Sequence, residues 1–426
     1  MKALLALLLF ALAGHVHGAI PVAPGDLDEA LENAEPGAIL ELQPGLHPGG
    51  VRIEVPLILR GQEGAVLDGF GAGNVLEVAA SGVTARDLHL RHDGANLTDT
   101  NSVIFVERGA DGVRLVNNRI EARGFGIWLS GVQRALVENN EISGDPTLRS
   151  QDRGNGIHLN NVRDSIIRGN TVWEARDGIY IDISNDNQLI GNKLHSQRYG
   201  IHYMFSHRNE VIGNRTRDNR TGFALMSSRD LDVRGNHSFG DQGYGFLLND
   251  LNNSRIEDNS AVSIRSQTTP GGGTAIRGGE GKAMFVYNAQ HNVIRGNVLA
   301  RTDIGIHLTA GSSGNEIYEN ALVGNRSQVK YVSNRPQEWS VNGRGNYWSD
   351  YMGWDMNADG IGDLPHEPND AIDRVLWKYP NARVLFNSPA VQLLRWIQRE
   401  FPVLRPAGVK DSAPLMRPPR SLEVLQ

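Results

Sequence analysis

Short runs of alternating apolar and polar residues recur along the middle of the chain. In the run 200–204, Ile201 and Tyr203 would point to one side of an extended strand, while His202 and Met204 would point to the other. Runs of this kind are too short for helices, and they are rich in β-branched residues. The pattern therefore predicts many short β-strands, each with an apolar inner face and an outward face.

An asparagine, in most cases preceded by glycine, marks the same place in each repeat. Successive members are 22 to 38 residues apart, and 22 is the commonest interval. The members are Asn118, Asn140, Asn170, Asn192, Asn214, Asn236, Asn259, Asn297, Asn320 and Asn346. A unit this short cannot hold a helical hairpin, so we predict a right-handed parallel β-helix whose coils stack about 4.8 Å apart.

Glycine and asparagine also suit the corners of such a fold. Both residue types tolerate left-handed backbone angles better than most others. We further expect the asparagines to stack as a ladder of amides, which satisfies buried backbone groups from one coil to the next.

The two ends of the repeat region have their own patterns. Lys2 precedes an apolar run over 3–13, which predicts a signal peptide over 1–18 and an exported, periplasmic protein. Residues 26–34 form an amphipathic pattern with Asp26 as N-cap and Glu29 three residues later, which predicts a helix that closes the open end of the solenoid. We therefore expect the β-helix to occupy 19–344.

Two further regions follow the repeats. We expect an irregular cap over 345–385 and a helix with a loose tail over 386–426. The helix carries a broad apolar face that includes Trp396 and Phe401. This face would either pack on the solenoid or dock onto a membrane partner, since Trp and Arg at its rim suit an interface.

Composition excludes several classes of function. The net charge is −6, which offers no basic footprint for nucleic acid, and the absence of cysteine excludes disulfides and thiolate chemistry.

The glycine-rich insertion 266–282 does not fit a phosphate-binding loop. Ile276 stands where the first glycine is required, and Ala283 replaces the Ser or Thr that holds magnesium. We interpret the insertion as a flexible flap.

An acidic segment in the cap has the spacing of a calcium loop. Its oxygen donors would be Asp355, Asn357, Asp359, the carbonyl of Ile361, and Asp363. The twelfth position is His366 instead of a bidentate glutamate. The pattern predicts a bound Ca²⁺ or Mg²⁺ with a structural role, and the alternative is a plain turn.

The 22-residue register places three soft donors on one outward face. His202 and Met204 are same-side neighbours along one strand, and Met226 stacks on Met204 from the next coil. Two thioethers with an imidazole suit cuprous copper, Cu⁺. The alternative is an apolar patch that binds a partner or lies under a loop. His158 and Tyr180 share the outward column of His202 and are expected to contact that partner.

A different class of protein also uses this type of fold. Secreted β-helices often bind or modify acidic polysaccharides with clustered carboxylates and a basic residue. Asp177, Asp182 and Asp186 lie near Arg176 in the sequence, but no outward column carries Asp on consecutive coils. A polysaccharide-binding or polysaccharide-modifying protein therefore remains the alternative hypothesis.

The end of the repeat region carries a specific resemblance. Gly-Asn-Tyr-Trp-Ser-Asp-Tyr occupies 345–351, and Asp-x-Asn-x-Asp-Gly-Ile-Gly-Asp occupies 355–363. Together with the signal peptide and the coils, these segments resemble the NosD family, periplasmic accessory proteins of nitrous-oxide reductase maturation. The resemblance covers nearly the whole mature chain.

The resemblance implies a set of partners and a non-enzymatic role. NosD proteins associate with an ABC-type ATPase and a membrane permease, and they act with a copper chaperone lipoprotein to build the copper centre of the reductase. The implied mechanism is conformational: the permease shifts the solenoid between states that bind the copper donor and the reductase differently. On this view the His202, Met204 and Met226 face is a docking and copper hand-over surface.

Overall fold

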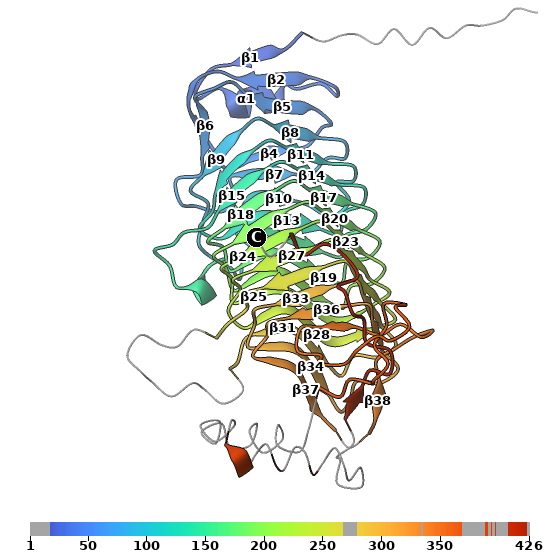
Figure 1. Ribbon diagram of the computed structural model, residues 1–426. Helices are drawn as coiled ribbons and strands as arrows, with labels where there is room; N and C mark the ends of the chain where they lie inside the picture. Colours follow the sequence, from blue (N-terminus) through green and yellow to red (C-terminus); the bar gives the residue numbers. More distant parts are fainter. Residues whose placement is uncertain are drawn as a thin grey trace, which may run out of the picture.

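The protein is a parallel β-helix, as the repeats predict. The computed structural model describes residues 18–266, 279–333, 335–368, 388–390, 393, 397 and 408–423 of the 426-residue chain. Coils are stacked into a tall solenoid with the N-terminal strands at one end (Figure 1). Each regular coil contributes one strand to each of three parallel sheets, which we call A, B and C.

The strands of the three sheets are short, and their bounds follow the repeat. Within the described residues sheet A contains β1 (Ile20–Val22), β2 (Ile39–Leu42), β5 (Ile58–Gly61), β8 (Thr84–Arg86), β11 (Arg114–Val116), β14 (Leu136–Glu138), β17 (Ile166–Arg168), β20 (Gln188–Ile190), β23 (Glu210–Ile212), β26 (Asp232–Arg234), β29 (Arg255–Glu257), β32 (Val293–Arg295) and β35 (Glu316–Tyr318). Sheet B contains β3 (Gly45–Pro48), β6 (Ala65–Asp68), β9 (His89–Arg91), β12 (Arg119–Glu121), β15 (Glu141–Ser143), β18 (Thr171–Trp173), β21 (Lys193–His195), β24 (Arg215–Arg217), β27 (His237–Phe239), β30 (Ser260–Val262), β33 (Val298–Ala300), β36 (Ala321–Val323) and β39 (Tyr347–Trp348). Sheet C contains β4 (Val51–Ile53), β7 (Leu76–Val78), β10 (Ser102–Val106), β13 (Phe125–Ser130), β16 (Ile157–Asn160), β19 (Asp177–Asp182), β22 (Tyr199–Met204), β25 (Thr221–Arg229), β28 (Tyr244–Asn252), β31 (Lys282–Tyr287), β34 (Ile304–Thr309) and β37 (Ser327–Val332).

The core is a continuous apolar column inside the coils. Ile201 and Tyr203 of β22 are fully buried, and the rings of Phe223 and Phe246 stack with centroids 4.7 Å apart. Because strand side chains alternate, the residues between these core positions must face outward. This alternation confirms the predicted inner and outer faces of β22.

The asparagine ladder runs through the bend between sheets A and B. The backbone N–H of Asn170 and its Nδ2 both donate to Oδ1 of Asn192 at 3.0 Å, and Nδ2 also donates to the carbonyl of Val137 at 2.9 Å. The ladder asparagines do not adopt left-handed angles themselves. The preceding residue does so in every case except Gly345, for example Gly169 with a φ of 66°. Glycine makes the turn at several ladder positions, and non-glycine residues such as Asn139 make it at others. The ladder asparagine then satisfies the backbone groups that the turn leaves unpaired.

The N-terminal helix forms, but its predicted cap does not. The helix α1 spans Leu27–Glu32, and Leu27 is buried in the core. Asp26 occupies the N-cap position without a side-chain capping hydrogen bond, because its backbone angles, φ −97° and ψ 8°, are not the extended ones that capping requires. Docking of Leu27, instead of the cap, therefore holds α1 at the end of the solenoid.

The chain returns to the solenoid near its C-terminus. Strand β40 (Val409–Lys410) pairs in parallel with β38 (Gln337–Glu338). Farther on, Arg420 donates to the carbonyl of Asp258 at 2.6 Å, so this segment runs back along earlier coils, shown in red in Figure 1. The long connection between β15 and β16 includes the short 3₁₀ helix Ser150–Asp152.

Some predicted features lie outside the described residues. These are the signal peptide except Gly18, most of the insertion 266–282, and the C-terminal helix with Trp396 and Phe401, apart from isolated positions. In the part of the chain that the structure describes, no helix is both long and apolar enough to cross a membrane.

Candidate functional site

The candidate site lies on the outer face of sheet C, over β16, β19, β22 and β25. Strand pairing places Met204 of β22 directly opposite Met226 of β25, and both side chains are partly exposed. His202 lies two residues before Met204 on the same side of the strand. The structure thus brings the three predicted soft donors to one wall, and neither methionine points into the core.

His202 is held by a buried carboxylate that the sequence-based interpretation assigned to another role. Nδ1 of His202 lies 2.9 Å from Oδ2 of Asp177, and Asp177 is completely buried. Arg198 donates to both carboxylate oxygens of Asp177, at 2.8 Å from Nε and 2.5 Å from Nη2. Burial acts to raise the pKa of Asp177, but hydrogen bonds from His202 and Arg198 outweigh it and hold this pKa below its usual value.

A column of rings continues from His202 toward the N-terminal coils. Successive ring centroids are 4.5 Å apart for Tyr180 and His202, 4.7 Å for His158 and Tyr180, and 3.8 Å for Trp128 and His158. His158 is 6% exposed, so Trp128 and Tyr180 form the accessible part of this column. Burial, followed by the charge of Arg176, lowers the pKa of His158 to about 3. His158 therefore stays neutral across the physiological range.

An apolar corner borders the two methionines. Ile183 and Phe205 directly follow β19 and β22, and they are 52% and 54% exposed. Both adopt left-handed angles, with a φ of 49°. Large side chains are rare in this conformation, and other coils place Asn161 and Ser227 there. The corner enlarges the exposed apolar surface beside Met204, and the sequence-based interpretation missed it because it tracked only strand positions.

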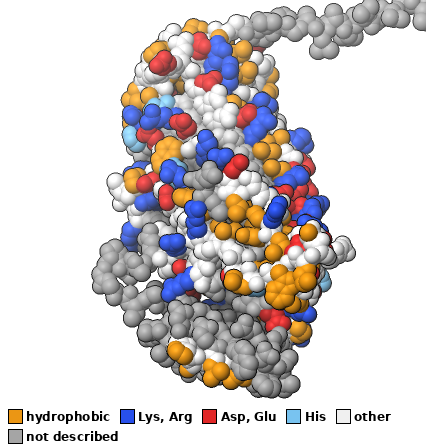
Figure 2. Space-filling model, viewed as in Figure 1, with side chains coloured by type: hydrophobic (Ala, Val, Ile, Leu, Met, Phe, Trp, Pro, Cys, Tyr) orange, Lys and Arg blue, Asp and Glu red, His pale blue; other side chains and the backbone are white. Residues whose placement is uncertain are grey.

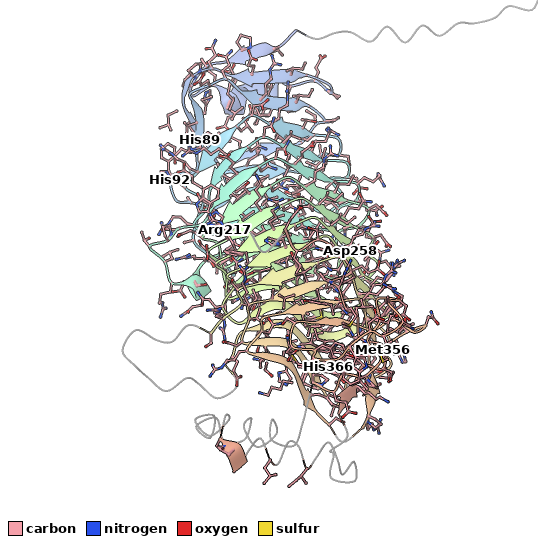
Figure 3. The ribbon with its side chains drawn as sticks, viewed as in Figure 1. His89, His92, Arg217, Asp258, Met356 and His366 are labelled. Atoms are coloured by element: carbon pink, nitrogen blue, oxygen red, sulfur yellow. The ribbon has the colours of Figure 1, made fainter. Side chains whose placement is uncertain are left out.

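The acidic loop of the cap folds around its own carboxylates. Asp355 accepts the N–H groups of Asp359 at 3.2 Å and Gly360 at 2.8 Å, and Asp363 accepts the N–H of Met356 at 2.8 Å. His366, the twelfth position, instead packs its ring against Trp348 and Tyr351. Met356 and His366 both lie at the C-terminal end of the solenoid (Figure 3).

The other predicted donors of this loop also bond within the loop. Nδ2 of Asn357 donates to Asp359 at 2.9 Å, and the N–H of Ile361 donates to the other oxygen of Asp359 at 2.8 Å. Across the described ranges, no three His, Asp or Glu side chains are arranged to hold a metal ion. A cation at this loop stays a prediction.

The three aspartates of the polysaccharide hypothesis have separate partners. Asp177 binds Arg198 and His202, Asp182 accepts Nδ2 of Asn160 at 3.4 Å, and Asp186 pairs with Arg208. On the face shown in Figure 2, basic and acidic side chains are interspersed instead of forming a single-sign stripe. Two of these aspartates are therefore paired with arginines, and Asp182 is hydrogen-bonded to a neutral amide.

Comparison with known proteins identifies the family. The profile described as "Periplasmic copper-binding protein (NosD)" matches residues 138–353, and that of a "Right handed beta helix region" matches residues 76–185. A relative from Pseudomonas aeruginosa, described as "Probable ABC transporter binding protein NosD", is 55% identical over 378 residues, 89% of this chain and 88% of the relative. A protein of the same description from Stutzerimonas stutzeri is 52% identical and covers 89% of this chain and 86% of its own length.

Solved structures agree on the fold. The surface adhesin PfbA of Streptococcus pneumoniae matches with a TM-score of 0.54 at 10% identity, over 71% of this chain and 86% of that one. DFA-IIIase from Arthrobacter chlorophenolicus A6 matches with a TM-score of 0.52 at 15% identity, over 77% of this chain and 93% of that one. At such identities the likeness shows the β-helix alone. The sequence matches carry more: this chain belongs to the NosD family of periplasmic copper-binding proteins.

Proposed function

We propose that this protein is the periplasmic docking and copper hand-over component of a machinery that matures the copper centre of nitrous-oxide reductase. It would work with an ABC-type ATPase and permease and receive Cu⁺ from a copper chaperone lipoprotein. The proposal includes export by the signal peptide over 1–18 and division of the mature chain at 344 and 385. Docking through the helix with Trp396 and Phe401 is part of the same proposal.

The observation that carries the proposal is the pairing of Met204 with Met226. Thioethers are soft ligands that favour cuprous copper over the hard cations of the periplasm. Two of them stand in register, partly exposed, on the wall that also carries His202. Partly exposed thioethers, beside a His202 that is only 9% exposed, suit cargo that must be received and released.

The energy for such a cycle would come from the partner ATPase. A partner that binds two conformations of the solenoid with different affinity shifts the population between them. The exposed corner formed by Ile183 and Phe205 lies beside the methionines and offers an apolar contact to the donor or acceptor protein. Tyr180 and, with its small exposed area, His158 would extend this contact.

The test replaces both sulfurs without changing the apolar character of the wall. We expect Met204→Leu/Met226→Leu to fold and to be exported, but to lose at least about tenfold in Cu⁺ affinity, measured by chelator competition. The matched control is Met352→Leu/Met356→Leu, since these two methionines are 91% and 84% exposed on the cap. Full Cu⁺ affinity in the first variant would contradict the copper site.

A docking-only role makes a different prediction for the same wall. If the face binds partners without touching copper, the double leucine variant should still support full copper loading of the reductase. A charged change such as Met204→Asp should then abolish loading by disrupting the apolar contact. Copper content of the co-produced reductase separates the two roles.

A further inference from the structure

The ion pair at the start of β19 has no role in the function proposed so far. Asp177 is fully buried, and both of its oxygens accept hydrogen bonds from Arg198. A buried carboxylate with this bidentate partner stays ionised, and an ionised carboxylate has no proton to donate. The hydrogen in its 2.9 Å contact with His202 must therefore reside on Nδ1 of the imidazole.

We infer that Asp177 is a positioning residue that presents Nε2 of His202 as the imidazole ligand of the proposed copper site. With the proton fixed on Nδ1, the lone pair of the neutral ring is on Nε2. Histidines that bind metals usually donate their other N–H to a carboxylate or a carbonyl in this way. The identity of the bound ion rests on the proposed function, whereas the hydrogen bond between Asp177 and His202 does not depend on it.

His158 shows the opposite arrangement in the same outward column. Nδ2 of Asn155 lies 3.2 Å from Nδ1 of His158, so the amide donates and Nδ1 accepts. The proton of this neutral ring is then on Nε2, which is buried without a hydrogen-bond partner. The partner of Nδ1 therefore decides which histidine can act as a ligand through Nε2. Asp177, on the neighbouring strand, prepares His202, whereas Asn155, three residues before His158 in the same coil, blocks His158.

Binding through Nε2 also balances in protons. The neutral imidazole gives the lone pair of Nε2 to Cu⁺ and keeps its own proton on Nδ1, where it is donated to Asp177, so no proton is released. Arg198 neutralises the carboxylate before and after the ion arrives. The Asp177 carboxylate thus keeps the same charge in the copper-free and the copper-bound protein.

The first measurement needs no copper. In the copper-free protein, ¹⁵N shifts of the His202 ring should report a proton on Nδ1. In Asp177→Asn the single oxygen is expected to face Arg198 and the amide NH₂ to face His202, as Asn155 faces His158. The His202 proton should then move to Nε2. The matched control is Asp186→Asn, which also removes one carboxylate from an arginine pair and should leave the His202 shifts unchanged.

The second measurement is a double-mutant cycle on Cu⁺ affinity. Asp177→Asn should weaken binding by about 10-fold to 100-fold, as is typical for residues that orient metal ligands. In a His202→Ala background the same change should have no further effect on Cu⁺ affinity, because the imidazole that Asp177 orients is absent. An equal loss in both backgrounds would mean that Asp177 only supports the strand, and it would overturn the inference.

The outcomes separate this inference from the proposed function. A proton on Nε2 of His202 in the unmodified protein overturns the inference, whatever the copper affinity. If Met204→Leu/Met226→Leu keeps its affinity while Asp177→Asn weakens binding only when His202 is present, the thioether site is wrong and the role of Asp177 holds. Loss of Cu⁺ affinity in both experiments supports both the thioether site and the positioning role of Asp177.

Discussion

The carboxylate of Asp411 accepts the indole N–H of Trp348, with Oδ2 and Nε1 2.7 Å apart. The same oxygen accepts the backbone N–H of Asn346 at 2.6 Å. Asp411 is fully buried. A residue from the returning C-terminal segment thus occupies the place that the next ladder asparagine would take. It closes the last coil, whose N–H groups would otherwise be unpaired.

Replacing Asp411 should therefore release the C-terminal segment. Asp411→Ala leaves the N–H groups of Asn346 and Trp348 buried without acceptors, which costs about 1 to 3 kcal/mol for each group. Because coils contact only their neighbours, the loss should be local to the last coils and residues 408–423. Faster amide hydrogen exchange there is the readout. Glu423→Gln, in the same segment, should change nothing, and unchanged exchange in Asp411→Ala would contradict the closing role.

Asp241 should make stability fall as pH rises. Burial raises the pKa of this fully buried carboxyl from its ordinary value of 3.8 to about 6. Since the folded state holds the proton more tightly, the free energy of unfolding is highest below pH 3.8 and decreases through pH 6, by about 3 kcal/mol in total.

The Asp241→Asn variant should remove that dependence. Its amide can hydrogen-bond to the hydroxyls of Thr216 and Ser238, which now donate to Oδ2 of Asp241 at 2.8 and 2.6 Å. We expect the variant to be more stable than the unmodified protein at pH 8 and to lose this advantage at pH 4, measured by urea unfolding. Exposed Asp218→Asn is the control, and parallel pH curves for the Asp241 variant and the unmodified protein would exclude the effect.

Phe205 is expected to lower the thermal stability of the folded protein. Its φ of 49° lies in the left-handed region, where a large side chain is unfavourable by about 1 kcal/mol and asparagine is tolerated. Phe205→Asn should therefore raise the midpoint of thermal unfolding. Phe239→Asn, at a strand position with 48% exposure, should not raise it. A lower midpoint for the Phe205 variant would show that its packing outweighs the strain.

The acidic loop should bind a divalent cation if its donors reorient. Calcium titration followed by calorimetry should give a saturable signal, and the thermal midpoint should rise with calcium by mass action. Asp355→Ala should abolish both effects, because Asp355 is the first predicted ligand and organises the loop through Asp359 and Gly360. Asp99→Ala serves as the control. If the unmodified protein gives no heat of calcium binding, the segment is a plain turn and the predicted cation site is wrong.

The repeat was sufficient to predict the architecture and its register. A spacing of 22 residues aligns Met204 with Met226, and strand pairing places them opposite each other. The alternation in 200–204 assigned Tyr203 to the core and His202 to the outer wall, as the burial of Tyr203 confirms. Both results follow from periodicity alone, because each coil repeats the backbone path of the one before.

The sequence was less informative about contacts between different columns. Asp177 was considered as part of a carboxylate cluster, yet its partner His202 lies on the next strand and three residues farther along the register. A 22-residue period aligns equivalent positions of adjacent coils, so it does not report a contact between two different columns. The roles of His366 and Asp411 escaped prediction for a similar reason, since irregular chain packs them on the last coil.

The amino-acid sequence by itself determined the parallel coils, the amide ladder and the wall on which each strand residue stands, since these depend on a repeating pattern of apolar, glycine and asparagine positions. Only the tertiary structure decided which nitrogen of His202 is held, which side chain closes the final coil and which corners carry strained apolar residues. Those features depend on contacts between residues that do not occupy equivalent positions in the repeat. The hydrogen bonds and the burial of each such contact are specific to it, so the repeating pattern does not predict them.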